Sequence, residues 1–238
     1  TAEDFATALD GVDLAKIPIF VQPGTSALAL GVLLAAAVQR QGTASTQLNG
    51  CVGSDPLGEL ARTGQLPCSL SLAYDEMAEL TAWAEIHAPN LDTIVVDGST
   101  AHNGGGNAVQ ELAFALATGV DYLRAMQARG LDIDTTASHM RFVFALGGNF
   151  FMEVAKLRAA RMLWSQIVEA FGGGDDAQRM VIHAQTARWN KTAIDPYINM
   201  LRVTTEAFAG AVGGVGSMAV APFDDTVRPA DEFARRIA

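Results

Sequence analysis

Short runs of branched apolar residues alternate along this chain with longer stretches of helical periodicity, and this alternation constrains the fold most. The pattern predicts six strands, at residues 17–21, 48–53, 91–97, 140–146, 180–184 and 215–221. Helices are expected between them, at residues 26–39, 74–87, 107–129, 149–171 and 195–211. Strands that alternate with helices form right-handed crossovers and a parallel sheet covered by helices. We therefore expect an α/β protein.

Two α/β architectures compete for this pattern. A doubly wound open sheet closes with five or six strands, whereas a (β/α)8 barrel takes about 250 residues and eight units. About six units in 238 residues, with ragged ends, favour a TIM-type barrel that is incomplete at both ends. No change in composition divides the chain, so residues 1–238 are expected to form a single domain. Because the chain starts at Thr1 without a methionine, we expect a segment of a longer polypeptide.

Charge and composition narrow the class of protein. The 16 Lys and Arg residues against 26 Asp and Glu give a net charge of −10, which argues against nucleic-acid or anionic-membrane partners. The longest apolar run, residues 28–38, is well short of the roughly 20 residues that a membrane span needs. Two cysteines, Cys51 and Cys68, lack the spacing of a disulfide framework or a metal knuckle. We expect a cytoplasmic protein.

A glycine run, Gly104–Gly106, lies between a predicted strand and a predicted helix. Its backbone amides could hold a phosphate at the helix N-terminus, or the run could be a tight turn between strand and helix. The absence of a GxGxxG spacing and of a P-loop lysine favours the turn.

Few polar residues suggest chemistry. His183 and Gln185 are two residues apart on a predicted buried strand, so their side chains share a face and could bind polar groups of a ligand. A purely structural role is the alternative. Glu153 and Lys156 are three residues apart on one helix, which predicts a solvated ion-pair face. No nucleophile elbow, HExxH motif or cobalamin loop is present, so we predict no catalytic residue and no metal ligand.

One helix carries a family resemblance. The segment GGNFFMEVAKLRAARMLW at Gly147–Trp164 closely resembles the signature helix of the methylmalonyl-CoA mutases, which are adenosylcobalamin-dependent acyl-CoA isomerases. Residues 108–125, residues 183–214 and the closing FARRIA agree as well, so the resemblance covers nearly all of the chain in order. It implies the substrate-binding barrel, in which coenzyme A threads along the axis. The separate cobalamin-binding domain lies outside this chain, so adenosylcobalamin is expected in the holoenzyme but not on this segment.

The polar set of the catalytic subunits is largely missing here. Their Gln at a strand end corresponds to Gly53, and their carboxylate-binding Arg corresponds to Thr63. Arg62 is adjacent in the sequence, but on a regular segment its side chain would point in another direction. Their Tyr and His correspond to Ser99 and Thr100. A further Gln and Asn of those subunits fall on Gly216 and Ala221.

The resemblance therefore implies the non-catalytic small (β) subunit of a heterodimeric mutase, inactive alone and paired with a catalytic large subunit. The complex would interconvert methylmalonyl-CoA and succinyl-CoA. His183 and Gln185 match the family's His-x-Gln-Thr element, which contacts substrate, so an acyl-CoA could still bind here. Two rival functions are an active mutase for a different acyl-CoA and a plain CoA-binding module.

Overall fold

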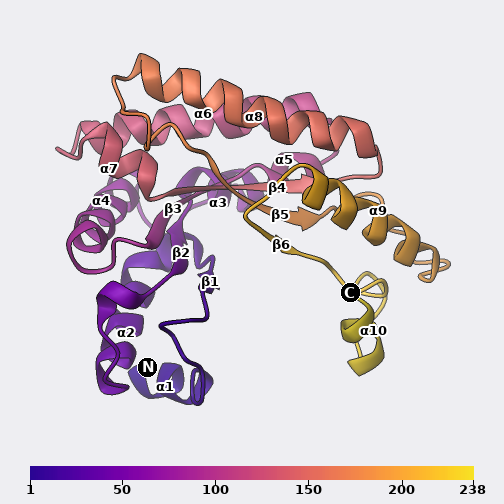
Figure 1. Cartoon of the computed structure of the whole chain (residues 1–238), viewed down its shortest axis with the longest axis horizontal. Helices are drawn as coiled ribbons and strands as arrows, with labels where there is room; N and C mark the ends of the chain where they lie inside the picture. Colours follow the sequence, from indigo (N-terminus) through magenta and orange to yellow (C-terminus); the bar gives the residue numbers. More distant parts are fainter. The chain divides into compact units, whose positions relative to one another are not determined.

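A computed structural model describes residues 1–238, and its strands and helices alternate as expected (Figure 1). The strands are β1 (Ile19–Val21), β2 (Gly50–Ser54), β3 (Leu91–Asp97), β4 (Met140–Leu146), β5 (Val181–Thr186) and β6 (Ser217–Ala219). They are hydrogen-bonded in chain order, and the pairs β1/β2, β2/β3 and β5/β6 are parallel. The α/β class and the six-stranded sheet predicted from the sequence are confirmed.

The helices include several that the sequence pattern did not predict. They are α1 (Ala2–Ala8), α2 (Ala27–Arg40), α3 (Pro56–Thr63), α4 (Leu70–His87), α5 (Ser99–Asn103), α6 (Ala108–Gln127), α7 (Ile133–Ser138), α8 (Phe150–Ala170), α9 (Ile198–Val212) and α10 (Glu232–Ile237). Two short 3-10 turns, η1 (Gly24–Ser26) and η2 (Ser45–Gln47), precede α2 and β2. The additional helices are α1, α3, α5, α7 and α10. None of the helices is long and apolar enough to cross a membrane.

Helix α3 occupies a stretch in which the sequence pattern predicts no helix. Asp55 caps its N-terminus, because the side-chain Oδ1 accepts a hydrogen bond from Gly58 N at 3.0 Å. Pro56 stands in the first turn, and Gly64 ends the helix in the left-handed region at φ 76°. Tyr122 donates its phenol hydrogen to the same Asp55 at 2.5 Å and accepts one from Leu57 N at 2.9 Å. Helix α3 is therefore fixed at its start, where it leaves β2.

The chain forms two compact units, each with its own packing. The first comprises Thr1–Val96, Thr118–Arg141 and Ile167–Arg179, and the second comprises Asp97–Ala117, Phe142–Gln166 and Met180–Ala238. In the first unit, α1 packs against α2 (Figure 1), and a buried apolar cluster includes Leu34, Val52 and Leu91. In the second unit, Phe142 meets Trp164 edge to face, with ring centroids 4.7 Å apart.

The expected solvated ion-pair face of α8 is wrong. The Lys156 side chain is only 1% exposed, and its Nζ lies 2.5 Å from Glu153 Oε2 and 2.5 Å from Glu111 Oε2. The Nζ also donates to Ala145 O at 2.6 Å, and Glu111 Oε1 accepts from Ala145 N at 2.7 Å. The (i, i+3) spacing indicated the pair correctly but could not show that α6 supplies a third charge and covers it.

The Gly104–Gly106 run is a turn, as favoured from the sequence, but it joins α5 to α6 and does not follow the strand directly. Its three backbone amides donate to Thr100 O, His102 O and Ala101 O, so none is free for a phosphate. Asn107 Oδ1 accepts hydrogen bonds from Val109 N and Gln110 N, both at 3.0 Å, and Gln110 Oε1 accepts from Asn107 N at 3.0 Å. This reciprocal cap occupies the donors at the start of α6 that a phosphate would need.

Candidate functional site

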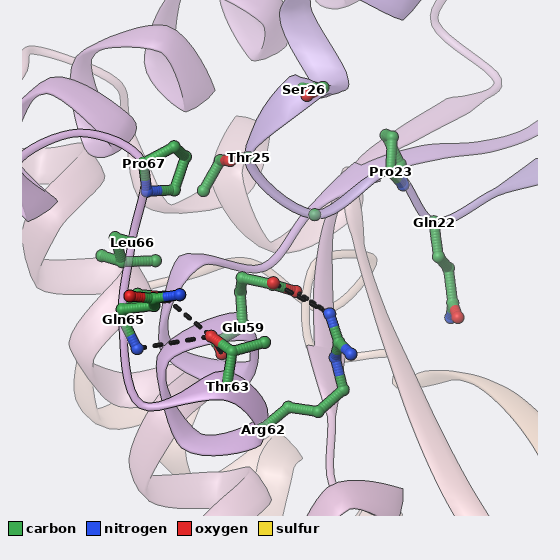
Figure 2. A pocket seen from close by; sticks show the side chains of 11 residues that line it. Gln22, Pro23, Thr25, Ser26, Glu59, Arg62, Thr63, Gln65, Leu66 and Pro67 are labelled. Carbon is green, nitrogen blue, oxygen red and sulfur yellow. Dashed lines mark hydrogen bonds and ion pairs between the residues drawn. The ribbon is translucent and has the colours of Figure 1, made fainter.

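A cavity of about 640 Å³ opens in the first unit, beyond the carboxyl ends of β1 and β2. Parallel α/β folds place ligand sites at this end of their strands, since the strand-to-helix loops gather there. The cavity is lined by Gln22, Pro23, Gly24, Thr25, Ser26, Glu59, Arg62, Thr63, Gln65, Leu66 and Pro67 (Figure 2). Its walls thus come from the loop after β1, from α3 and from the loop that leads into α4.

The one charged pair in the cavity is Arg62 with Glu59. Arg62 Nη2 donates to both carboxylate oxygens of Glu59, at 2.8 Å and 2.7 Å (Figure 2). The two residues are neighbours because they are three apart on α3. Gly24 lies close by, since a Cβ atom there would be 3.3 Å from Glu59 Oε2. The Glu59 carboxylate is therefore held between Arg62 and the loop after β1.

Thr63 is satisfied by the backbone around it. Its Oγ1 lies 2.8 Å from Glu59 O and 2.7 Å from Gln65 O, and it accepts from Gln65 N at 3.3 Å (Figure 2). The hydroxyl therefore closes the C-terminal turn of α3.

These contacts set the electrostatics of the cavity. Arg62 is the only lysine or arginine in the lining, and its charge is already compensated by Glu59. The Arg62 side chain is 62% exposed, so a ligand carboxylate would meet a guanidinium that Glu59 already neutralises and that water screens. The remaining polar lining is uncharged and consists of amides and hydroxyls, from Gln22, Thr25 and Ser26 among others. The cavity suits an uncharged polar ligand better than an anion.

Gly53 has no room for a side chain. A Cβ atom there would lie 2.1 Å from Val95 Cγ2 and 3.0 Å from Cys51 Sγ. The register between β2 and β3 shifts at this point, because Cys51 pairs with Asp92 whereas Ser54 pairs with Ile94. Burial also raises the pKa of the Cys51 thiol far above its usual range, so this thiol is not a nucleophile. There is therefore no room for a longer side chain at this position of β2.

Ser99 lies in the second unit, at the start of α5. Its Oγ donates to Asp97 Oδ1 at 2.5 Å, and its backbone N donates to the same oxygen at 2.9 Å. The Ser99 side chain is buried, while Thr100 is half-buried. The Ser99 hydroxyl therefore supports the turn that follows β3.

His183 and Gln185 share a face of β5, as predicted. Both are half-buried and alternate with the buried Ile182 and Ala184. In the β5/β6 register His183 pairs with Ser217, and His183 Nδ1 lies 2.9 Å from Ser217 Oγ. Ligand binding by these two residues stays a prediction.

Glu59 is not among the predicted site residues, although it pairs with the only cation in the cavity lining. The available signal was the Glu59-x-x-Arg62 spacing, which favours an ion pair on any helix. That signal needed α3 to be predicted first. Because the capping signs of α3 went unused, the pair was missed.

The parallel α/β sheet and the cavity beyond its strand ends define the class of protein, and comparison with known proteins defines the family. The family model for methylmalonyl-CoA mutase matches residues 1–238. The chain belongs to the methylmalonyl-CoA mutase family.

Three relatives illustrate the similarity. The methylmalonyl-CoA mutase small subunit of Streptomyces virginiae is 39% identical over 97% of this chain and 37% of its own length. The methylmalonyl-CoA mutase of Escherichia coli is 35% identical over 100% of this chain and 34% of its own length. The large subunit of Propionibacterium freudenreichii is 33% identical over 99% of this chain and 32% of its own length. The chain thus spans about a third of the length of these relatives.

Proposed function

We propose that this chain is a TIM-type barrel segment, residues 1–238 acting as one domain, of a non-catalytic small mutase subunit. It would support a catalytic large subunit that interconverts methylmalonyl-CoA and succinyl-CoA, and it would be inactive alone. The observation that carries this proposal is the compensated Arg62. Its charge is committed to Glu59 in the cavity where the family's substrate carboxylate would need a cation.

The physical argument concerns the substrate's charge. Methylmalonyl-CoA carries a carboxylate on its acyl group, and a carboxylate in a protein cavity needs a charged, hydrogen-bonding partner. The family's arginine is replaced by Thr63, whose hydroxyl is engaged with Glu59 O and Gln65 O. The family's glutamine is replaced by Gly53, where Val95 fills the space. Without this arginine and this glutamine, the site binds the substrate less tightly and also stabilises the transition state less.

The relatives support the subunit assignment. One relative is named a small subunit and is 39% identical, while the large subunits of Propionibacterium freudenreichii and of mycobacteria are 33–34% identical. Names of both kinds support a heterodimer in which this chain pairs with a large subunit. The free thiols of Cys51 and Cys68 are in keeping with the cytoplasmic setting that we propose.

Adenosylcobalamin, which the family implies, supplies the organic radical that starts such a rearrangement. Three of the four histidines of this chain do not fit a cobalt ligand. Both ring nitrogens of His139 have hydrogen-bond partners, and His183 Nδ1 faces Ser217. His87 lies at the end of α4 that leads into β3, away from the carboxyl ends of the strands. We propose that the cofactor is held by parts of the holoenzyme outside these residues.

A second candidate is an active enzyme for an acyl-CoA that lacks the carboxylate. The uncharged amide and hydroxyl lining of the cavity favours it, because such a lining would accept a neutral acyl group. In this case His183 and Gln185 are expected to contact the thioester portion of the ligand, as the family's His-x-Gln-Thr element does.

Calorimetric titration of the full-length protein with CoA thioesters tests both candidates. The small-subunit proposal expects methylmalonyl-CoA to bind no more tightly than butyryl-CoA, because the carboxylate gains no partner. Binding of butyryl-CoA that weakens in His183→Ala, together with turnover, would favour the second candidate. Preferential binding of methylmalonyl-CoA by the chain alone would contradict the proposal.

A further inference from the structure

A second cavity, of about 600 Å³, lies in the second unit beyond the carboxyl ends of β4 and β5. Five elements contribute to it: α5, the start of α6, the loop between β4 and α8, the start of α8, and the loop after β5. Its lining is His102, Asn107, Ala108, Val109, Gln110, Gly147, Gly148, Asn149, Met152, Glu153, Trp189 and Asn190. None of the substituted family positions discussed above is among these residues.

Two buried polar side chains form the floor of this cavity. His102 is 8% exposed and Glu153 is 3% exposed. Both face the same glycine, because a Cβ atom on Gly147 would lie 3.2 Å from Glu153 Oε1 and 3.2 Å from His102 Nε2. The buried atoms of these side chains that lack a hydrogen-bond partner are the opposite ones, His102 Nδ1 and Glu153 Oε2, which lie toward Glu111 and Lys156. Glu153 Oε1 and His102 Nε2 are the atoms that converge at Gly147, where a ligand in the cavity can meet both.

The charges beneath the floor are unequal. One ammonium, Lys156, faces two carboxylates, Glu111 and Glu153, at 2.5 Å each. His102 Nδ1 lies 3.3 Å from Glu111 Oε2, and its Nε2 is the ring nitrogen that faces Gly147. Two carboxylates thus share one ammonium, and Glu153 Oε1 is the carboxylate oxygen that faces the cavity. A cationic hydrogen-bond donor in the cavity would give this oxygen a charged partner.

The walls of the cavity are partly apolar. The Trp189 indole is 67% exposed, and Val109 and Met152 are also exposed. An indole face attracts a cation as well as an apolar chain. A second polar group, Asn190, is already engaged, since its Nδ2 donates to Glu206 Oε1 at 2.6 Å. The cavity thus combines a floor that bears the Glu153 carboxylate with an apolar, aromatic wall.

We propose that this cavity binds an ammonium or guanidinium group carried on a short apolar chain. The cation donates hydrogen bonds to Glu153 Oε1 and His102 Nε2 over Gly147, and its carrier lies against Trp189. Two sources share this chemistry: a small free amine, or a lysine or arginine side chain of a partner subunit. The proposal stands apart from the proposed function, because it uses none of the residues on which that function depends.

The test is a titration of the full-length protein with n-butylammonium chloride at constant ionic strength, followed by calorimetry and tryptophan fluorescence. Its matched probes are 1-butanol and butyrate, which have the same chain without the positive charge. We expect saturable binding of n-butylammonium and binding at least about tenfold weaker for the other two probes. Glu153→Gln, which keeps the shape of the side chain, is expected to weaken n-butylammonium binding by at least about tenfold.

Gly147→Ala is a second variant, because its methyl group covers Glu153 Oε1 and His102 Nε2 without removing either. It should also abolish binding, whereas Glu85→Gln, far along the chain in the first unit, should leave binding unchanged. Circular dichroism and thermal melting establish that each variant is folded. If only one of the two pocket variants folds, that variant alone decides the outcome.

The purified complex with the large subunit distinguishes the two sources. If the natural ligand is a free amine, the complex should bind n-butylammonium as the single chain does. If the natural ligand is a side chain of the partner subunit, the complex should no longer bind n-butylammonium, and Gly147→Ala should weaken the association of the two subunits. Equal binding of butyrate or 1-butanol, or no loss of binding in a folded pocket variant, would overturn the proposal. Failure here would leave mutase activity, and thus the proposed function, untouched.

Discussion

Arg62 Nη2 lies 2.8 Å and 2.7 Å from the two carboxylate oxygens of Glu59. The only cation in the cavity beyond β1 and β2 is therefore paired with a residue of its own helix. The pair is local, because it needs only one turn of α3. Its consequence is chemical, since a guanidinium that already has a carboxylate offers little to a second one. The cavity thus contains the positive charge that the free carboxylate of a methylmalonyl group would need, but this charge is already paired with Glu59.

Releasing Arg62 should therefore create anion affinity. In Glu59→Gln the guanidinium loses its carboxylate, and we expect methylmalonyl-CoA to bind about tenfold more tightly than to the unmodified protein. Binding of butyryl-CoA, which has no acyl carboxylate, should not change. Calorimetry of both thioesters measures this, with the exposed Glu79→Gln on α4 as a control. Equal affinity of both proteins for methylmalonyl-CoA would show that Arg62 is not the residue that limits carboxylate binding.

Restoring the family's glutamine at Gly53 should fail. A side chain there collides with Val95 Cγ2, so Gly53→Gln is expected to destabilise the fold by about 1–3 kcal/mol or more. Gly216→Gln is the matched control, because it also restores a family glutamine. A Cβ atom at Gly216 would lie 3.5 Å from Ile182 O, an ordinary contact, so its cost should stay below about 1 kcal/mol. Urea unfolding of both variants compares the two costs, and equal costs would contradict the steric argument.

The buried lysine of α8 should matter far more than an exposed one. Lys156→Met leaves Glu111 and Glu153 without their cation, and we expect a loss of about 3–5 kcal/mol in the free energy of unfolding. Lys16→Met removes an exposed pair with Asp13 and should not change stability measurably. Chemical denaturation measures both variants. A loss below about 1 kcal/mol for Lys156→Met would mean that the cluster is not buried as described.

Glu206 should give the protein a specific dependence of stability on pH. Burial raises the pKa of this carboxyl, although Lys191 and Asn190 act in the opposite direction. A folded-state pKa above the unfolded value of 4.5 means that the folded state holds the proton more tightly. The resulting stability is present below pH 4.5 and is lost as pH rises through the folded-state pKa.

The measurement is the free energy of unfolding of the unmodified protein minus that of Glu206→Gln, followed upward from about pH 4. We expect this difference to fall as pH rises through the window above 4.5. Burial also lowers the pKa of Lys191, the partner of Glu206. A difference that rises with pH over this window would contradict the burial argument for Glu206.

The strands that the sequence predicts best are those whose apolar residues run on without interruption. β3 and β4 have the predicted bounds, because both are buried along nearly their whole length and contain an unbroken apolar run, Ile94–Val96 in β3 and Phe142–Leu146 in β4. β2 is displaced by one or two residues, since its glycines carry no periodicity and Gly50 takes a φ of 120°. Helix α3 was missed although Asp55, Pro56 and Gly64 are ordinary start and stop signals.

The candidate sites show where sequence reasoning stops. That His183 and Gln185 share a face follows from strand periodicity alone. The pairing of Glu59 with Arg62 was within reach once α3 was known. The convergence of His102 and Glu153 over Gly147 was not, because these residues come from three different elements and meet only through tertiary packing. For the same reason, the spacing of Glu153 and Lys156 suggested a surface pair and could not show its burial.

The most direct test of the account is an activity assay of the full-length chain and the large subunit from the same source, each alone and both together. The assay contains adenosylcobalamin and methylmalonyl-CoA and measures the formation of succinyl-CoA. The account predicts no turnover by this chain alone, and turnover by the co-purified pair. Turnover of methylmalonyl-CoA by this chain alone, or the absence of any association with the large subunit, would contradict it.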